Sequence, residues 1–295
     1  MTEWFNNLDV KLQVIIISSI TSLTVFMLGW FFKVVYDRFS LTHKMKKEFE
    51  FEQRKKLKEE IAKNKTHFLN SIESLNHRMW NFSQNVDKNW HKISKEKWFE
   101  TDDQYYINSF VYRFLCFLHW TLKTEKDTIS VDTTIADKED VLYLKWVKTF
   151  KDIFTDADLL QELNYDNTKN TNHFYKNDLI GYSKWVVFNH AVIDFDEFET
   201  KLQYNYEPLE KVIEYFTQIE GTNDDKNLNV LRCYHLLAIQ FLNDYGHDYQ
   251  KTDDKKIKRI TDLYKGKIKI KTGFEEFVKK SKLEDEMKKP IRKIK

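Results

Sequence analysis

Glycine and proline are scarce in this sequence, which has six glycines and two prolines in 295 residues. Neither residue occurs between Trp30 and Ile180. Because sheets need frequent turns, and turns depend on these two residues, their scarcity favours long helices. Only two cysteines are present, Cys116 and Cys233, and both lie in apolar, helical-looking runs. This pattern is unlike a secreted disulfide framework and predicts buried free thiols in a reducing compartment.

The familiar signatures of enzymes are also absent. The sequence has no Gly-rich phosphate loop, no His-Glu-x-x-His helix, no Cys-x-x-Cys pair and no Gly-x-Ser-x-Gly elbow. We therefore expect no cofactor and no metal. An acidic cluster has the oxygen ligands of a hard-cation site, but it is also typical of the first turn of a helix, the interpretation that we favour. The cluster consists of Asp194, Asp196, Glu197 and Glu199.

One apolar run, Leu12 to Phe32, contains 21 residues and no charged side chain. As a helix, at ~1.5 Å per residue, it would be roughly 31 Å long, close to the thickness of the hydrocarbon core of a bilayer. A cleaved signal peptide would have a shorter apolar region, a basic start and a small-residue cleavage site, and none of these fits. The run predicts a transmembrane helix over residues 12–36, after an N-terminal segment of residues 1–11.

The residues that flank this run predict its orientation. Glu3, Asp9 and Lys11 precede it, and five basic residues follow it: Lys33, Arg38, Lys44, Lys46 and Lys47. By the positive-inside rule, we expect a single-pass protein of the inner (cytoplasmic) membrane, with its N-terminus outside and its C-terminal domain in the cytoplasm. Aromatic residues at both ends suit the two interfacial belts: Trp4 and Phe5 before the run, and Trp30, Phe31, Phe32 and Tyr36 at its end.

Small residues recur on one face of the predicted transmembrane helix. Ser18, Ser22 and Gly29 share this face with Val25. Small faces let membrane helices approach closely, so this pattern predicts self-association into a homo-oligomer in the lipid bilayer. Alternatively, the Ser and Thr side chains only bond to the carbonyls of their own helical turn. The sequence leaves both interpretations open.

The net charge of +2 conceals a strong segregation of charge along the chain. Arg38 to Lys65 carries ten basic and five acidic residues, Asp152 to Lys226 six and sixteen, and Lys251 to Lys295 seventeen and eight. The first block fits a collar on the inner leaflet, where each basic residue contributes ~1 kcal/mol. The last is a basic C-terminal tail, residues 251–295, that we expect to be frayed. Its charge suits lipid, an RNA or ribonucleoprotein partner, or the acidic middle of the same or a neighbouring subunit.

Residues 37–98 predict one or two long helices beside the membrane. The second part of this segment carries large apolar residues at spacings of three and four: Phe68, Ile72, Leu75, Met79, Phe82, Val86, Trp90 and Ile93. This seam can pack on the chain's own domain or pair with another chain as a coiled coil. Its large, mixed side chains favour packing on the chain's own domain, since a dimeric zipper prefers Leu with Ile or Val.

Residues 99–250 predict a cytosolic helical bundle, so the fold class is all-α with one membrane span. A helix start is expected at residues 101–103, followed by a helix, Tyr105 to Leu122, that is apolar nearly all round and therefore central. A second such helix is predicted from Leu228 to Tyr245, with Gly246 as its end. Another helix is expected over residues 138–154, and a short strand over residues 266–274.

Two polar residues stand out in the first apolar helix, in the run Arg113-Phe-Leu-Cys-Phe-Leu-His119. Their spacing resembles the R-x4-6-H signature of HEPN domains, helical bundles that in many defence systems cleave RNA as dimers. The resemblance implies that His119 would move a proton at the ribose 2′-OH or at the leaving oxygen. It implies that Arg113 would stabilise the charge of the phosphate.

This chain departs from the family pattern at Phe114, where the family usually has a polar residue. On an uninterrupted helix Arg113 and His119 would lie about 120° apart, so their cooperation would need a bend or a second subunit. The alternative is a structural role for both residues. Arg113 would then be a buried cation paired with a core carboxylate, and His119 a hydrogen-bonded core histidine.

Arg232 and His235 form a second polar pair, three residues apart and therefore on one face of an apolar helix. They would complete a buried polar cluster with Arg113, or line a pocket with Asp244 and His247. A purely structural role is the simpler alternative.

The single span, the helical cytosolic domain and the R-x5-H helix together resemble the HEPN-like, membrane-anchored accessory or effector proteins of bacterial antiviral defence systems, including those beside RNA-targeting CRISPR nucleases. The resemblance implies an effector that acts through an oligomeric membrane assembly. A second hypothesis is a membrane-tethered, metal-independent ribonuclease that uses Arg113 and His119. A third is a non-catalytic membrane scaffold that recruits a cytosolic partner through its basic tail.

Overall fold

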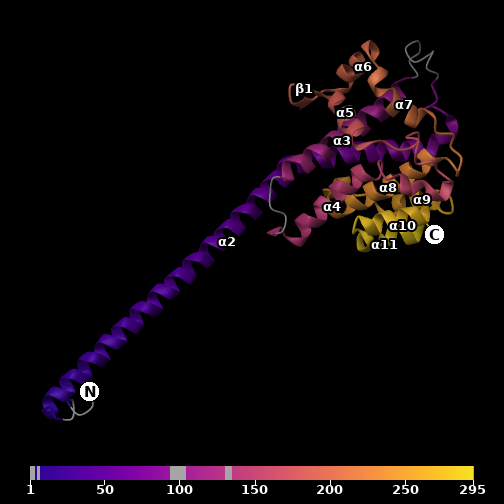
Figure 1. Ribbon diagram of the computed structural model, residues 1–295. Helices are drawn as coiled ribbons and strands as arrows, with labels where there is room; N and C mark the ends of the chain where they lie inside the picture. Colours follow the sequence, from indigo (N-terminus) through magenta and orange to yellow (C-terminus); the bar gives the residue numbers. More distant parts are fainter. Residues whose placement is uncertain (1–3, 5–6, 94–103, 130–134, 295) are drawn as a thin grey trace. The chain divides into compact units, whose positions relative to one another are not determined.

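The computed structural model describes residues 4, 7–93, 104–129 and 135–294 (Figure 1). About 78% of it is helical and it has almost no strand, so the prediction of an all-α chain is confirmed. The chain divides into two compact units, Met1–Lys56 and Leu57–Lys295. The helix start that we predicted at residues 101–103 lies outside the described residues.

The first unit is built on the N-terminal part of α2 (Val10–Asn85), a helix of 76 residues. Apart from Gly29, this helix contains no glycine and no proline, so nothing in its sequence interrupts the backbone hydrogen bonds. It is the one helix among the described residues that is long and apolar enough to cross a membrane, and none of its most apolar window is buried. The segment that we predicted to span the membrane and most of the helical segment that we predicted after it belong to this one helix.

The second unit begins with the remainder of α2. Here the predicted seam is buried from Phe68 to Phe82, and Leu57 and Ile61 extend it toward the N-terminus. The seam thus packs on the chain's own domain, as we predicted. Beyond the end of α2, where η1 (Val86–Lys88) follows, the predicted seam is less buried: the side chain of Trp90 is 46% exposed.

Two buried helices occupy the centre of the second unit. These are α3 (Tyr105–Thr128) and α8 (Lys226–Tyr245), whose extents largely match the two predicted apolar helices. The side chain of Asp225 begins α8 by accepting a hydrogen bond from the backbone nitrogen of Leu228 at 2.9 Å, and Gly246 follows its last residue.

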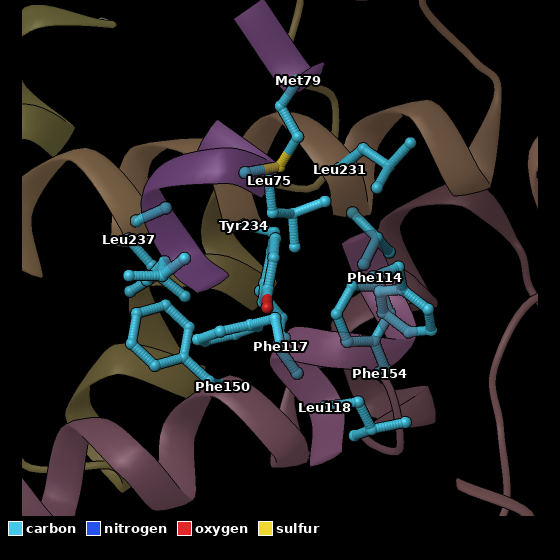
Figure 2. Packing of buried hydrophobic residues seen from close by; sticks show 14 of the residues in the cluster. Leu75, Met79, Phe114, Phe117, Leu118, Phe150, Phe154, Leu231, Tyr234 and Leu237 are labelled. Carbon is cyan, nitrogen blue, oxygen red and sulfur yellow. The ribbon is translucent and has the colours of Figure 1, made fainter. Parts of the chain in front are cut away.

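Aromatic side chains from three helices meet in the core (Figure 2). The ring of Phe117 on α3 lies 5.2 Å from that of Phe150 on α4 (Lys138–Asp152), and Tyr234 on α8 lies 4.7 Å from Phe154. Each large apolar side chain buried in this way contributes about 1.5–3 kcal/mol to stability. The predicted free thiols Cys116 and Cys233 are confirmed as buried. Burial raises the pKa of Cys116 to about 12, so this thiol is protonated at neutral pH.

A hairpin that we did not predict lies in the middle of the chain. It follows η5 (Ala157–Leu163), α5 (Lys176–Ser183) and η6 (Lys184–Val186), and consists of antiparallel strands β1 (Val187–Phe188) and β2 (Ala191–Val192). The two turn residues, Asn189 and His190, have φ angles of 45° and 67°, as the turn of a two-residue hairpin requires. The hairpin could not be recognised in the sequence because such turns usually contain glycine, and this one contains Asn189 and His190.

The acidic cluster starts a helix, as we favoured. Asp194 precedes α6 (Phe195–Tyr204) and accepts a hydrogen bond from the backbone nitrogen of Glu197 at 2.8 Å. The helices η7 (Glu207–Leu209) and α7 (Glu210–Thr217) follow.

The expectation of a frayed tail with a short strand is wrong. Residues 248–293 form η8 (Asp248–Gln250), α9 (Asp254–Tyr264), α10 (Lys271–Lys280) and α11 (Glu284–Lys293), coloured yellow toward the C-terminus in Figure 1. Apolar residues recur at helical spacing among the lysines, and those such as Ile260, Phe274 and Met287 are buried in the common core. The lysines leave an apolar face on each helix, so the segment can fold onto the domain.

Candidate functional site

A groove of about 600 Å³ lies beside Arg113 in the second unit. Helix α2 contributes four polar side chains to its lining: His67, Asn70, Ser71 and Ser74. Helix α3 contributes Tyr112, Arg113, Cys116 and Trp120, and the hairpin contributes His190, Ala191 and Val192. No lining residue in the described part of the chain is acidic. We call this feature the Arg113 groove.

Regular spacing explains how the two helices form the walls of the Arg113 groove. The lining residues of each helix are separated by one, three or four positions, so they share one face. The rings of His67 and Trp120 stack at 4.3 Å across the two helices, with an interplanar angle of 8°. Tyr112 donates a hydrogen bond to the carbonyl oxygen of Ile193 at 2.7 Å, which fastens the end of the hairpin to α3.

Arg113 is half-buried in the wall of this groove. Among the described residues, no carboxylate lies within ion-pair distance of its guanidinium group. The described part of the chain therefore does not contain the buried ion pair that the structural alternative predicted. The reason is local: Phe114 and Leu115 take the core positions of α3, and Arg113 is left on the groove side.

A second arginine, Arg78, is buried near the groove and was not singled out by the sequence analysis. Its Nη2 donates a hydrogen bond to Ser109 Oγ, and its guanidinium carbon lies 4.7 Å from the centre of the Tyr106 ring. Its Nε is buried without a hydrogen-bond partner in the described residues. Burial lowers the pKa of Arg78, and the positive charge of Arg113 lowers it further. Two interacting guanidinium groups without a described carboxylate partner make this region attractive to an anion.

Arg78 does have a signal in the sequence. It is a charged residue inside an apolar seam, directly before Met79, and it continues the α2 face of Ser71 and Ser74. Its partners, Ser109 and Tyr106, come from a different helix, so their approach could not be predicted from spacing alone.

His119 does not line the Arg113 groove. Its ring lies edge-on to that of Trp120, with a centre-to-centre distance of 5.3 Å. Burial lowers the pKa of His119, and the charge of Lys123 adds to the effect. Helix α3 runs without a break from Tyr105 to Thr128, so one chain does not bring Arg113 and His119 into the same groove. Their catalytic role stays a prediction that requires a second copy.

Arg232 and His235 meet at the ring of Tyr264. His235 Nδ1 lies 2.6 Å from the Tyr264 hydroxyl oxygen, which lies 2.5 Å from Ser83 Oγ. Arg232 donates a hydrogen bond to the carbonyl oxygen of Lys267 at 2.8 Å, with its guanidinium 5.9 Å from the Tyr264 ring. Burial lowers the pKa of His235 to about 3, so this side chain is neutral at physiological pH. The cluster links α2, α8 and α9 inside the fold.

The expected partners of this pair lie elsewhere. Arg113 belongs to the groove. Asp244 accepts a hydrogen bond from Gln240 at 2.9 Å, and His247 stacks on Tyr249. The structural interpretation of the pair therefore fits its surroundings best. Among the described residues, no group of three or more His, Cys, Asp and Glu side chains could hold a metal ion.

The small face of α2 lies in the first unit. Ser18 donates a hydrogen bond to the carbonyl oxygen of Ile15 at 3.0 Å, and Thr21 and Thr24 bond in the same way to their own helix. A Cβ atom added at Gly29 would meet no other atom within 4 Å. Local bonding thus occurs, and it leaves the face of Ser18, Ser22 and Gly29 exposed. Its role in self-association stays a prediction.

The lining of the Arg113 groove is suited to bind a ligand. It offers a guanidinium group, imidazoles, hydroxyls and a stacked ring pair, which together suit an anion that carries a flat ring. In comparisons with known proteins, no family model, no curated protein and no solved structure matches this chain.

Proposed function

We propose that this protein is a membrane-anchored effector or accessory protein that acts through an oligomeric assembly in the inner membrane. One observation carries the proposal: none of the most apolar window of α2 is buried in the single chain. Leaving a large apolar side chain in water costs about 1.5–3 kcal/mol, so a bilayer or further copies of the chain must cover this run. The charges that flank it support a cytoplasmic position for the second unit, by the positive-inside rule.

The small face of the span supports the oligomeric part of the proposal. Gly29 offers open space for a neighbouring backbone, and Ser18 and Ser22 continue the same face. Without a hydrophobic driving force between helices in lipid, such close approach is what favours association. The antiviral-defence setting comes from the resemblance to HEPN-like membrane-anchored proteins.

The test is to reconstitute the full chain in lipid vesicles and measure cross-linked species and dye leakage. We expect higher oligomers and leakage, and we expect both to fall in Gly29→Leu and Ser22→Leu, because the larger side chains separate the backbones. Thr24→Leu is the matched control, since it enlarges a small residue on another face of the same helix. Unchanged oligomers in both variants would leave the span as a simple anchor.

A membrane-tethered ribonuclease is the second candidate, and the Arg113 groove favours it. The groove contains no described acidic residue, and Arg78 and Arg113 lie close enough for their charges to interact. RNA phosphates suit such a region. Because α3 is unbroken and His119 does not line the groove, the catalytic histidine would have to come from a second copy.

This candidate is tested by RNA cleavage with the wild-type chain and with His119→Ala. General acid–base catalysis predicts a loss of ~10²–10⁴-fold in the variant, with an unchanged melting curve. No cleavage by the wild type would exclude the ribonuclease and leave the assembly as the function.

A further inference from the structure

A second pocket of about 530 Å³ lies on the second unit, away from the Arg113 groove. Three segments that are distant in the sequence form it: α4 with the turn that follows it, the first residue of α5, and the end of α10. Each segment contributes lysine, and the five lysines are Lys145, Lys148, Lys176, Lys280 and Lys282. We call this feature the lysine pocket.

Two carboxylates belong to the lysine pocket, and both already face a lysine. Asp156 accepts a hydrogen bond from Lys280 Nζ at 3.0 Å. Asp152 Oδ1 lies 3.9 Å from Lys176 Nζ and 4.0 Å from the Nζ of Lys151, which is a neighbour of the pocket. The acidic side chains therefore fix the positions of lysines without neutralising the whole lining.

Three lysines of the pocket have no carboxylate partner among the described residues. These are Lys145 and Lys148, three positions apart on α4, and Lys282, which follows α10 with a left-handed φ of 57°. The C-terminal end of α10 is the negative end of its helix dipole, which favours a lysine there, such as Lys282. This dipole does not explain why lysines from α4 and α5 also line the pocket. An anionic ligand would relieve their mutual repulsion.

We propose that the lysine pocket binds a small polyphosphorylated molecule, the chemistry of the triphosphate chain of a nucleotide. The volume of the pocket lies in the range of small-molecule sites. Lysine ammonium groups bind phosphate oxygens as point charges, and several of them can spread over a chain of phosphates. The proposal concerns a site on the second unit and does not depend on membrane assembly.

The experiment is isothermal titration of the full chain, held in nanodiscs of zwitterionic lipid, with inorganic tripolyphosphate, ATP and adenosine. We expect one saturable site per chain for tripolyphosphate, binding of ATP at the same site and no binding of adenosine. The double variant Lys148→Gln/Lys282→Gln should bind tripolyphosphate about tenfold more weakly or worse, because two charge-assisted contacts are lost. Both side chains are exposed, so the variant should keep the wild-type melting curve.

Lys279→Gln is the matched control, since this exposed lysine lies beside Lys280 on α10 but does not line the pocket. It should leave the affinity for tripolyphosphate within about twofold, because screened surface charges act weakly at a distance. Weaker tripolyphosphate binding in nanodiscs that contain a phosphoinositide would identify a lipid headgroup as the source of the phosphates. Unchanged binding there would identify a soluble ligand.

Three results would overturn the proposal. The first is no saturable binding of tripolyphosphate or ATP. The second is binding that the double variant does not weaken, which would locate the phosphates elsewhere. The third is binding of a 20-nucleotide RNA that the double variant abolishes while tripolyphosphate does not bind, which would make the pocket part of an RNA surface.

Discussion

The two ends of α2 are parts of one helix, yet they carry apolar residues in different ways. From Leu12 to Phe32 apolar side chains lie all round the helix, and none of the most apolar window is buried. From Leu57 to Phe82 they follow a seam of three and four positions, and the seam is buried in protein. The comparison teaches that the arrangement of apolar residues decides what covers a helix. An apolar surface on every side suits lipid, whereas a stripe suits one protein surface.

The strongest test of this difference between the two parts of α2 is to remove one phenylalanine from each part. Phe68→Ala should destabilise the second unit by about 3–5 kcal/mol, because Phe68 is fully buried among the rings of Phe117, Phe150 and Phe241. Phe26→Ala should leave the unfolding of that unit unchanged, since Phe26 is 71% exposed. Near-UV circular dichroism during urea unfolding of the full chain would measure both. Equal losses would contradict the distinction.

A charged residue placed in the apolar run tests whether lipid covers this part of α2. Ile20→Lys should raise the free energy of membrane insertion by about 3–4 kcal/mol, because a lysine at the centre of a span loses its hydration and the favourable contribution of isoleucine is lost. Extraction of membranes with alkaline carbonate should then release the variant and not the wild type. Wild-type protein that is itself released would show that the run does not span the bilayer.

Acid should lower the free energy of unfolding of the second unit through His235 on α8. The hydroxyl group of Tyr264 lies within hydrogen-bond distance of both His235 and Ser83, and Ser83 belongs to the packed part of α2. Burial, with a smaller effect from the charge of Lys256, lowers the pKa of His235 to about 3. Its ordinary pKa is about 6.5, so below pH 6.5 the unfolded chain binds a proton that the folded chain does not. Stability should fall by up to about 1.4 kcal/mol per pH unit between pH 6.5 and 3.

The measurement is urea unfolding from pH 7.5 to pH 4.5. His235→Gln should give a flatter dependence over this range, although it lowers stability at pH 7.5. An equally steep profile in this variant would assign the acid sensitivity to other groups.

The smallest expected effect concerns Arg113. Because no described carboxylate pairs with it and it is half-buried beside the groove, Arg113→Ala should change the free energy of unfolding by no more than about 0.5 kcal/mol. A loss of several kcal/mol in thermal unfolding would return Arg113 to the structural role that the sequence allowed.

The helical framework could be predicted because its signals are local. The seam of α2, the extent of α8 before Gly246 and the cap at Asp194 each depend on residues within a few positions of one another. The C-terminal helices were missed because a high lysine content hides a regular apolar stripe, which includes Phe274 and Met287.

The candidate sites could be predicted only in part, because they depend on segments that meet from far along the chain. Arg113 was singled out by its apolar surroundings, but its groove also needs α2 and a hairpin whose turn lacks glycine. The buried position of Arg78 involves a hydrogen bond to Ser109, which is 31 residues further along the chain. The lysine pocket joins α4 to α10, and no spacing rule connects Lys148 with Lys282.

The hairpin turn has a histidine at a position where glycine would cause less backbone strain. His190 adopts a φ of 67°, a region that glycine occupies at little cost but that disfavours other residues by roughly 1–2 kcal/mol. Glycine there would relieve the backbone strain and would remove the imidazole from the lining of the Arg113 groove. The chain thus accepts local strain at a position where an imidazole lines the Arg113 groove.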